Sequence, residues 1–183
     1  QINMILSDKD IKKALASGEI SAIGAELYIG PSSMDLHLDN QGREHSVLKN
    51  KILDSREDES KSFVRFQFVN IIVYPGDFYI LSTKEKLRFS DNIAGFVQGR
   101  SSIARLGLHV HAAGFVDPGF EGTITLEVSN PTKTPIKIYA GQRICQMVFV
   151  RTTSPVSVSY KNKSDAKYYN QFGPTASLIH EDR

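Results

Sequence analysis

The stretch TITLEV at Thr123–Val128 decides the fold, because apolar and polar residues alternate along its whole length. Successive side chains of a β-strand point to opposite faces, so the three apolar residues share one face. The two threonines share the other face with Glu127. The same period of two recurs in MDLHL at Met34–Leu38. Both segments predict strands that bury one face.

Further strands and turns are expected on either side of this stretch. Phe63–Val73 is rich in aromatic and β-branched residues, and YPGD at Tyr74–Asp77 follows it as a strong turn signal. Three more turn signals lie at Asn130-Pro131, Tyr139–Gln142 and Ser154-Pro155. Short strands with such punctuation predict a mostly β chain, folded as a distorted antiparallel β-barrel or jelly roll.

A short helix is expected near the amino end. Ser7 can cap its free amide groups, with Asp10 in the capping-box position three residues later. Ser17-Gly18 is a typical helix end. Two other segments lack a strand pattern: the charged Gln41–Ser62, expected to be a surface excursion, and the polar tail Lys161–Arg183. The tail is either a frayed terminus or a segment ordered by ligand.

Composition limits the classes of function. A length of 183 residues suits one domain, here expected to span residues 1–183. The net charge is +2, from 22 basic and 20 acidic residues, and no stretch concentrates the basic ones. This argues against a nucleic-acid partner and favours a small anionic ligand.

The chain has one cysteine, Cys145, which excludes an internal disulfide and a multi-cysteine metal cage. Its apolar neighbours predict a small buried thiol in a strand. No apolar run approaches the roughly 20 residues of a membrane span, and no signal peptide is recognisable. We therefore expect a cytoplasmic protein without a membrane partner.

The densest functional signal is GRSSIARLG at Gly99–Gly107, where two guanidiniums and two hydroxyls surround a turn into a helix-like segment. Hydroxyl and amide donors at a helix start, together with cationic forks, suit an oligophosphate. The alternative is an ordinary helix cap with two solvated arginines. These nine residues leave both interpretations open.

Two carboxylates and a histidine pair are further candidates. Asp117 stands between a β-type run and a Pro-Gly turn, so it either projects from a strand end or merely starts the turn. Glu127 lies on the polar face of its strand, exposed to water or lining a cleft. A partly buried carboxyl there would have a raised pKa and could shuttle protons. His109 and His111 alternate on one strand face, a spacing that could bind a metal ion. Because no cysteines or clustered carboxylates are nearby, a packing or hydrogen-bonding role is favoured.

Taken in order, these segments resemble the dCTP deaminase family of the trimeric dUTPase superfamily. The resemblance runs nearly from end to end, apart from Gln41–Ser62. It rests mainly on Gly99–Leu108, Ala113–Gly122 and Ile124–Glu127. Supporting matches are Met4–Asp8, Ser33–Leu36, Pro135 with Gly141–Gln146, and Asp165–Gln171.

The resemblance implies a dUTPase-like barrel or jelly roll that forms a homotrimer, with active sites between subunits and a tail, about residues 161–183, that closes over the ligand. Magnesium would accompany the triphosphate. Catalytic roles would fall to Glu127 as general acid and base, and to Arg105, Ser101 and Asp117. Nucleotide contacts are implied for Arg100, Ser101, Ser102, Ile103, Ala104, Arg105, Asp117, Thr125, Leu126, Glu127, Gln146, Tyr160, Lys167 and Gln171.

The implied reaction is the deamination of dCTP to dUTP and ammonia without zinc. Zinc-dependent cytidine deaminases carry an H-x-E…P-C-x-x-C pattern, which a chain with one cysteine cannot supply. Glu127 would activate the attacking water instead. The alternatives are a bifunctional enzyme that continues to dUMP and pyrophosphate, a plain dUTP diphosphatase, and a non-catalytic nucleotide-binding regulator. The short loop His111–Gly114 is closer to a subgroup in which the bifunctional activity is plausible, and it puts a threonine-dependent feedback switch by dTTP in doubt.

Overall fold

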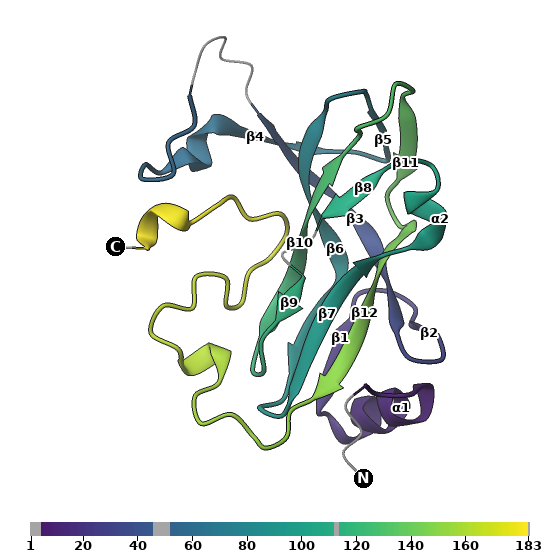
Figure 1. Cartoon of the computed structure of the whole chain (residues 1–183), viewed down its shortest axis with the longest axis vertical. Coiled ribbons are helices and arrows are strands. Elements are labelled where there is room, and N and C mark those ends of the chain that lie inside the picture. Colours follow the sequence, from purple (N-terminus) through teal and green to yellow (C-terminus); the bar gives the residue numbers. More distant parts are fainter. Residues whose placement is uncertain (1–4, 46–51, 112–113, 183) are drawn as a thin grey trace.

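The computed structural model describes residues 5–45, 52–111 and 114–182, except the side chain of His111. These residues form a ten-stranded, curled antiparallel sheet and a separate two-stranded sheet (Figure 1). The mostly β fold predicted from the alternating segments is therefore confirmed. The strands are β1 (Ile20–Ile23), β2 (Tyr28–Ile29), β3 (Met34–His45), β4 (Phe63–Gln67), β5 (Asn70–Val73), β6 (Phe78–Phe89), β7 (Ile93–Gly99), β8 (His109–His111), β9 (Phe115–Val116), β10 (Glu121–Ser129), β11 (Ile136–Tyr139) and β12 (Arg143–Arg151).

The large sheet runs in the order β8-β10-β6-β3-β12-β7-β9, and β1, β2 and β4 pair onto β6 and β3. The helical segments are short: α1 (Asp8–Ser17), α2 (Ser101–Ala104) and the 3-10 turns η1 (Glu59–Ser62), η2 (Tyr160–Asn162) and η3 (Ile179–Glu181). Because β3, β6 and β10 are neighbours, residues from three distant parts of the sequence share one sheet face. The candidate site is built on this face.

The alternation in Thr123–Val128 sets which face of β10 is buried. Leu126 and Val128 are completely buried in the core, whereas Thr125 and Glu127 are half-buried on the other face. Thr123 departs from the pattern, since it is also buried. The carboxyl-terminal tail covers it, and the Thr123 amide donates a hydrogen bond to the Gln171 carbonyl at 3.1 Å. The predicted polar face is thus covered by protein rather than open to water.

The local signals at the amino end are confirmed. Ser7 and Asp10 form the predicted capping box of α1. Gly18 ends the helix in the left-handed conformation at φ +76°, which glycine adopts without a Cβ penalty. The helix buries Ile11 and Ala14. The Tyr74–Asp77 turn is also confirmed, since the Asp77 amide donates to the Tyr74 carbonyl at 3.0 Å.

One prediction about the middle of the chain needs correction. Residues 41–45 do not belong to a surface excursion, because β3 continues to His45 and pairs with β4. In the described part of the chain, the exposed turns and η1 begin at residue 52. The run Phe63–Val73 forms two strands, as its composition allows: β4 pairs with β3 of the large sheet, and β5 pairs with β11 of the small one. Composition alone could not reveal this change of sheet.

Candidate active site

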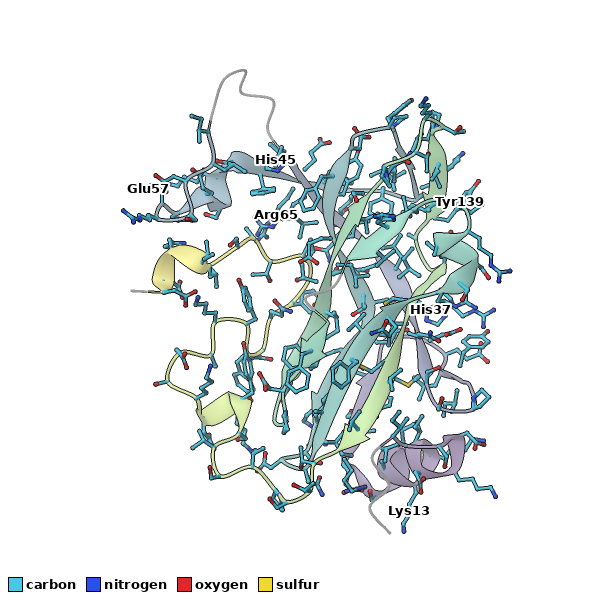
Figure 2. The ribbon with its side chains drawn as sticks, in the orientation of Figure 1. Lys13, His37, His45, Glu57, Arg65 and Tyr139 are labelled. Carbon is cyan, nitrogen blue, oxygen red and sulfur yellow. The ribbon has the colours of Figure 1, made fainter. Side chains whose placement is uncertain are left out.

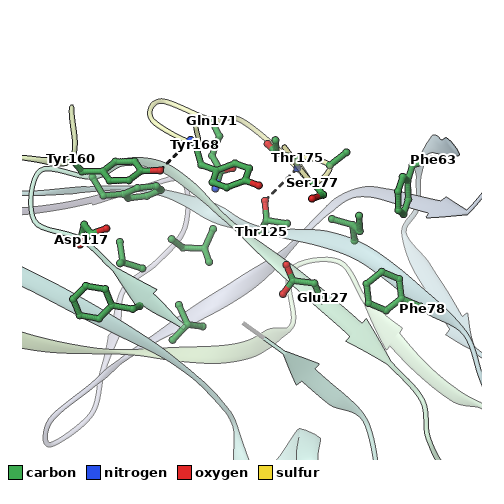
Figure 3. Close-up of a pocket in the computed structure, with 17 residues that line it drawn as sticks. Phe63, Phe78, Asp117, Thr125, Glu127, Tyr160, Tyr168, Gln171, Thr175 and Ser177 are labelled. Carbon is green, nitrogen blue, oxygen red and sulfur yellow. Dashed lines mark hydrogen bonds between the residues drawn. The ribbon is translucent and has the colours of Figure 1, made fainter. Parts of the chain in front are cut away.

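A pocket of about 420 Å³ lies where the carboxyl-terminal tail crosses β9 and β10 (Figure 3). Five of the predicted site residues line it: Asp117, Thr125, Glu127, Tyr160 and Gln171. The rest of the lining is largely apolar and aromatic. It consists of Phe63, Phe78, Ile80, Val97, Phe115, Val116, Phe120, Ile124, Tyr168, Thr175, Ala176 and Ser177.

Glu127 occupies the middle of the pocket face of β10, opposite Ile80 of β6 in the strand register. Its carboxyl group lies between Thr125 and Phe78 in Figure 3. Burial among these neighbours raises the pKa of Glu127, because a carboxylate loses hydration there. Of the two interpretations left open by the sequence, the structure therefore favours a sheltered carboxyl over one facing bulk solvent.

Asp117 follows directly after β9. It both starts a turn and projects its carboxylate from the strand end, the two roles that the sequence left open. Its backbone carbonyl accepts a hydrogen bond from the Phe120 amide at 3.2 Å, and Gly119 has φ +81°, so the residue starts a turn. Its side chain is exposed and lines the pocket. An exposed carboxylate in this position can accept hydrogen bonds from a ligand without a large desolvation cost.

The tail closes the pocket through hydrogen bonds to β10. The Gln171 side-chain amide donates to the Thr123 carbonyl at 2.8 Å, and the Thr175 amide donates to the Thr125 hydroxyl at 3.3 Å. The oxygen of the Gln171 side-chain amide, Oε1, is buried and has no hydrogen-bond partner among the described residues. An unsatisfied buried acceptor is costly, so a donor group on a ligand would relieve it.

Gly122 allows the tail to come this close. A Cβ at this residue would lie 2.8 Å from the Gln171 carbonyl oxygen, and the backbone has φ +146°. Any other residue would therefore collide with the tail backbone. A hydrogen bond at 3.1 Å from the Tyr168 amide to the Tyr160 hydroxyl then fixes the tail against its own beginning. The position of the tail over the pocket therefore depends both on Gly122 in β10 and on the hydrogen bond between Tyr168 and Tyr160 within the tail.

The arginine–serine segment lies elsewhere. None of the described residues that line the pocket is a lysine or an arginine. In Figure 1, α2 lies on the opposite side of the molecule from the tail. Ser101, Ser102, Ala104 and Arg105 are exposed, and Ile103 anchors the short helix in the core. The described chain thus does not bring this predicted group into the pocket.

Arg100 is held at the start of α2 by a carboxylate that the sequence analysis did not single out. Its Nε atom lies 3.2 Å from Asp35 Oδ2, and Nη1 of Arg143 lies 3.2 Å from the same oxygen. Arg143 also stacks over the Tyr28 ring at 4.6 Å from the centroid. These contacts orient two guanidiniums at one end of the sheet, which suits recognition of an anion.

Besides Arg100–Arg105, three further predicted contacts lie outside the pocket lining. The Leu126 side chain is fully buried in the core, so only its backbone could meet a ligand. Gln146 pairs with Gln98 close to α2, and its side-chain oxygen accepts from the Ser33 hydroxyl at 3.2 Å. Lys167 forms an ion pair with Asp182, and the hydrogen bond between them raises the pKa of Lys167.

Sequence reasoning missed several lining residues. Phe63 and Phe78 come from strands without a motif, and their approach to Glu127 depends on strand register. Tyr168 lies in the tail segment Asp165–Gln171 that supports the family resemblance, but the resemblance implies no role for it. For Thr175 and Ser177 no sequence signal exists, because only the path of the tail brings them to the pocket.

Other features of the described residues bear on cofactors and location. No group of three or more His, Cys, Asp or Glu side chains in this part of the chain could hold a metal ion. Cys145 is buried in β12, where burial raises the pKa of its thiol, so the predicted unreactive role is supported. No helix in the described ranges is long and apolar enough to cross a membrane.

Known structures define the broader class first. The dUTPase of EIAV aligns with a TM-score of 0.51 at 21% identity, covering 75% of this chain and 92% of that one. A 2'-deoxycytidine 5'-triphosphate deaminase from Agrobacterium tumefaciens aligns with a TM-score of 0.66 at 20% identity. It covers 82% of this chain and 49% of that one, so this chain spans about half its length. At such identities the likeness shows the fold alone, which is dUTPase-like as predicted.

The family follows from closer matches. The model of the dCTP deaminase-like family matches residues 5–152. A relative from Methanosphaera stadtmanae named dCTP deaminase, dUMP-forming, is 43% identical over 187 positions, covering 97% of this chain and 95% of its own. A relative of the same name from Dictyoglomus thermophilum is 40% identical over 187 positions, covering 98% and 96%. The chain belongs to the dCTP deaminase-like family, and the prediction of an enzyme of this family is confirmed.

Proposed function

We propose that the chain deaminates dCTP and carries the product on to dUMP. The first step is supported above all by the sheltered Glu127 in the pocket between β10 and the tail. The second is supported by the relatives, which are named dUMP-forming. Their names favour the bifunctional alternative over the leading prediction, which stopped at dUTP.

In the first step Glu127 accepts a proton from a water molecule, and the water oxygen attacks C4 of cytosine. The new C–O bond forms a tetrahedral centre, and the proton passes from Glu127 to the amino group. The exocyclic C4–N4 bond then breaks to release ammonia, and the proton of the new hydroxyl group moves to N3, so that dCTP and water give dUTP and ammonia. A carboxyl whose pKa is raised by burial suits both halves of this cycle near neutral pH. Thr125 lies beside it on the same strand face to hold the pyrimidine edge.

In the second step a further water attacks the α-phosphate of dUTP. The bond from the α-phosphorus to the bridging oxygen breaks, giving dUMP and pyrophosphate. Asp117 is the exposed carboxylate of the pocket lining and is the group that would orient this water. Gln171, with its unsatisfied Oε1, would accept a hydrogen bond from the nucleoside.

The pocket of one chain is not suited to hold a triphosphate by itself, because the described residues that line it include no cationic side chain. The groups suited to phosphates, Arg100, Ser101, Ser102 and Arg105, lie on the far side of the same chain (Figure 1). We therefore propose a homotrimer, in which α2 of one subunit completes the pocket of the next. Arg105 and the Ser101 hydroxyl would then stabilise charge that develops during the reaction.

Magnesium is proposed as the companion of the triphosphate. The described residues offer no cage of three ligands, so phosphate oxygens would be its main ligands. A dUTPase from phage phi11 of S. aureus, with a TM-score of 0.50 at 10% identity, is described as coordinating a structural Mg(II) ion. When bound, the metal neutralises phosphate charge. Zinc is not part of the proposal, nor is a nucleic-acid or membrane partner, and we propose a cytoplasmic location.

The test is to incubate the purified protein with dCTP and magnesium, and to measure ammonia, pyrophosphate and nucleotides over time. We expect ammonia and pyrophosphate in equal amounts, with dUMP as the final nucleotide. Ammonia with accumulating dUTP would support a deaminase without the second step. Pyrophosphate from dUTP but no ammonia from dCTP would make the chain a plain dUTP diphosphatase, and binding without turnover would make it a regulator.

A further inference from the structure

Arg43 of β3 is a buried cation in the sheet face that carries the pocket. It lies opposite Ile80 of β6, which in turn lies opposite Glu127 of β10. On its other side it faces Arg65 of β4, labelled in Figure 2. Directly opposed residues of antiparallel strands point to the same face. Arg43 therefore shares the face of Glu127, two strands away, although it is not part of the pocket lining.

Its surroundings are unusual for a buried charge. Arg43 is 9% exposed, and no acidic side chain among the described residues pairs with it. Burial, and then the charge of Arg65, lower the pKa of Arg43. A buried cation without a counter-charge is costly unless a strong acceptor meets it.

The acceptor is the backbone of the tail. Arg43 Nε donates to the Pro174 carbonyl oxygen at 2.8 Å. Pro174 is itself buried and directly precedes Thr175 and Ala176, which line the pocket. In the described part of the chain, the side-chain hydrogen bonds between β10 and the tail join neutral groups, such as Gln171 with Thr123. Lys86 of β6 adds a second charged donor, whose bond to the Asn170 side chain at 3.2 Å is exposed to solvent. A charge-assisted bond is about twice as strong as a neutral one.

We propose that Arg43 is a positioning residue that latches the carboxyl-terminal tail over the pocket, without touching the nucleotide. Closing the tail removes water from the guanidinium, and the bond to Pro174 offsets that loss. The two effects oppose each other, so the latch is strong enough to order the tail and weak enough to release it. A strap that opens for substrate entry and product release needs this balance. The kinetic part of this inference rests on the proposed function.

The test compares Arg43→Met with Arg65→Met. Methionine keeps an unbranched side chain but cannot donate to Pro174. Arg65 lies opposite in the register on the same face, without a side-chain bond to the tail among the described contacts, so it is the matched control. We expect Arg43→Met to raise the KM for dCTP about tenfold, the size expected for losing one hydrogen bond to a charged group, with a smaller change in kcat. Arg65→Met should leave KM within about twofold.

Hydrogen exchange of the tail in the free protein is the second readout. Amides of residues 168–178 should exchange about tenfold faster in Arg43→Met, with α1 and β12 unchanged. Arg43→Lys keeps the charge but moves the donor, and should lie between wild type and Arg43→Met in both readouts. If Arg43→Met does not fold, Arg43→Lys decides by the same measures.

The latch would be overturned if the Arg43 variants had the same hydrogen-exchange rates in the tail and the same KM for dCTP as Arg65→Met. The exchange experiment needs no turnover. A wild-type protein that fails to deaminate dCTP would therefore refute the proposed function, while the latch would still be judged by tail exchange.

Discussion

The pocket under the tail and the α2 segment are opposites in chemistry. The described lining of the pocket is mainly aromatic and aliphatic, with uncharged polar groups such as Thr125, the carboxyls of Asp117 and Glu127, and no lysine or arginine. The α2 segment presents hydroxyls and guanidiniums on an exposed helix of four residues. A nucleoside suits the first region and a triphosphate suits the second.

Segments that are close in the sequence therefore need not lie close together in space within one folded subunit. Only a short stretch separates Arg105 from Asp117, but α2 lies away from the tail that covers the pocket (Figure 1). Each region has half of what a nucleoside triphosphate requires. A symmetric oligomer with head-to-tail contacts joins the halves without any change in the chain itself.

The largest expected effect comes from removing the acid and base of the pocket. Glu127→Gln keeps the size of the side chain but cannot accept the proton of water. We expect ammonia release from dCTP to fall by roughly 10²–10⁴-fold, the usual contribution of general acid–base catalysis. Hydrolysis of added dUTP and the affinity for nucleotide should persist. Loss of nucleotide binding together with ammonia release would assign Glu127 a structural role instead.

Next in size is the loss of a cation from the other region. Arg105→Ala should lower kcat/KM by roughly 10²-fold or more, because a guanidinium that stabilises developing charge has no substitute. The measurement is steady-state turnover of dCTP, with Arg56→Ala as the control, an exposed arginine in another loop. An unchanged rate in Arg105→Ala would remove α2 from the active site.

A smaller effect is expected where the tail meets β10. Gly122→Ala places a methyl group against the Gln171 backbone and should raise KM about tenfold, since strain of this kind costs on the order of 1–3 kcal/mol. Gly76→Ala is the matched control, because it also has positive φ but no atom near the added Cβ. Equal KM values in the two variants would show that the tail contact does not matter for binding.

The smallest effect concerns stability and pH. Burial raises the folded-state pKa of Glu127, so the folded protein holds this proton more tightly than the unfolded chain. The corresponding stability is present below the unfolded pKa and is lost as pH rises through the folded pKa. Glu127→Gln, which cannot ionise, should gain in Tm over wild type, on the order of a few degrees, as pH rises from 4 to 8. A difference in Tm that stays constant with pH would contradict a sheltered carboxyl.

The sequence predicted best those features that local physics determines. The caps of α1, the turn at Tyr74–Asp77 and the buried face of Leu126 and Val128 depend on residues a few positions apart. The position of Glu127 on the polar face was predictable, but its burial was not. The tail and β6 create that burial from distant parts of the chain.

Contacts between distant segments explain the rest. The bond from Arg43 to Pro174 joins residues 131 positions apart. The aromatic side of the pocket, with Phe63 and Phe78, follows from the register of β4, β3 and β6. Neither a period of two nor a turn signal carries information on register across such separations. The family resemblance named residues of both regions but could not say which of them one chain brings together.

The most direct measurement mixes the two inactive variants. Arg105→Ala retains an intact pocket, and Glu127→Gln retains an intact α2 segment. If one subunit completes the pocket of the next, subunits mixed at random in equal amounts should recover about one quarter of wild-type ammonia release. A mixture that exchanges subunits and stays as inactive as its parents would contradict an active site shared between chains.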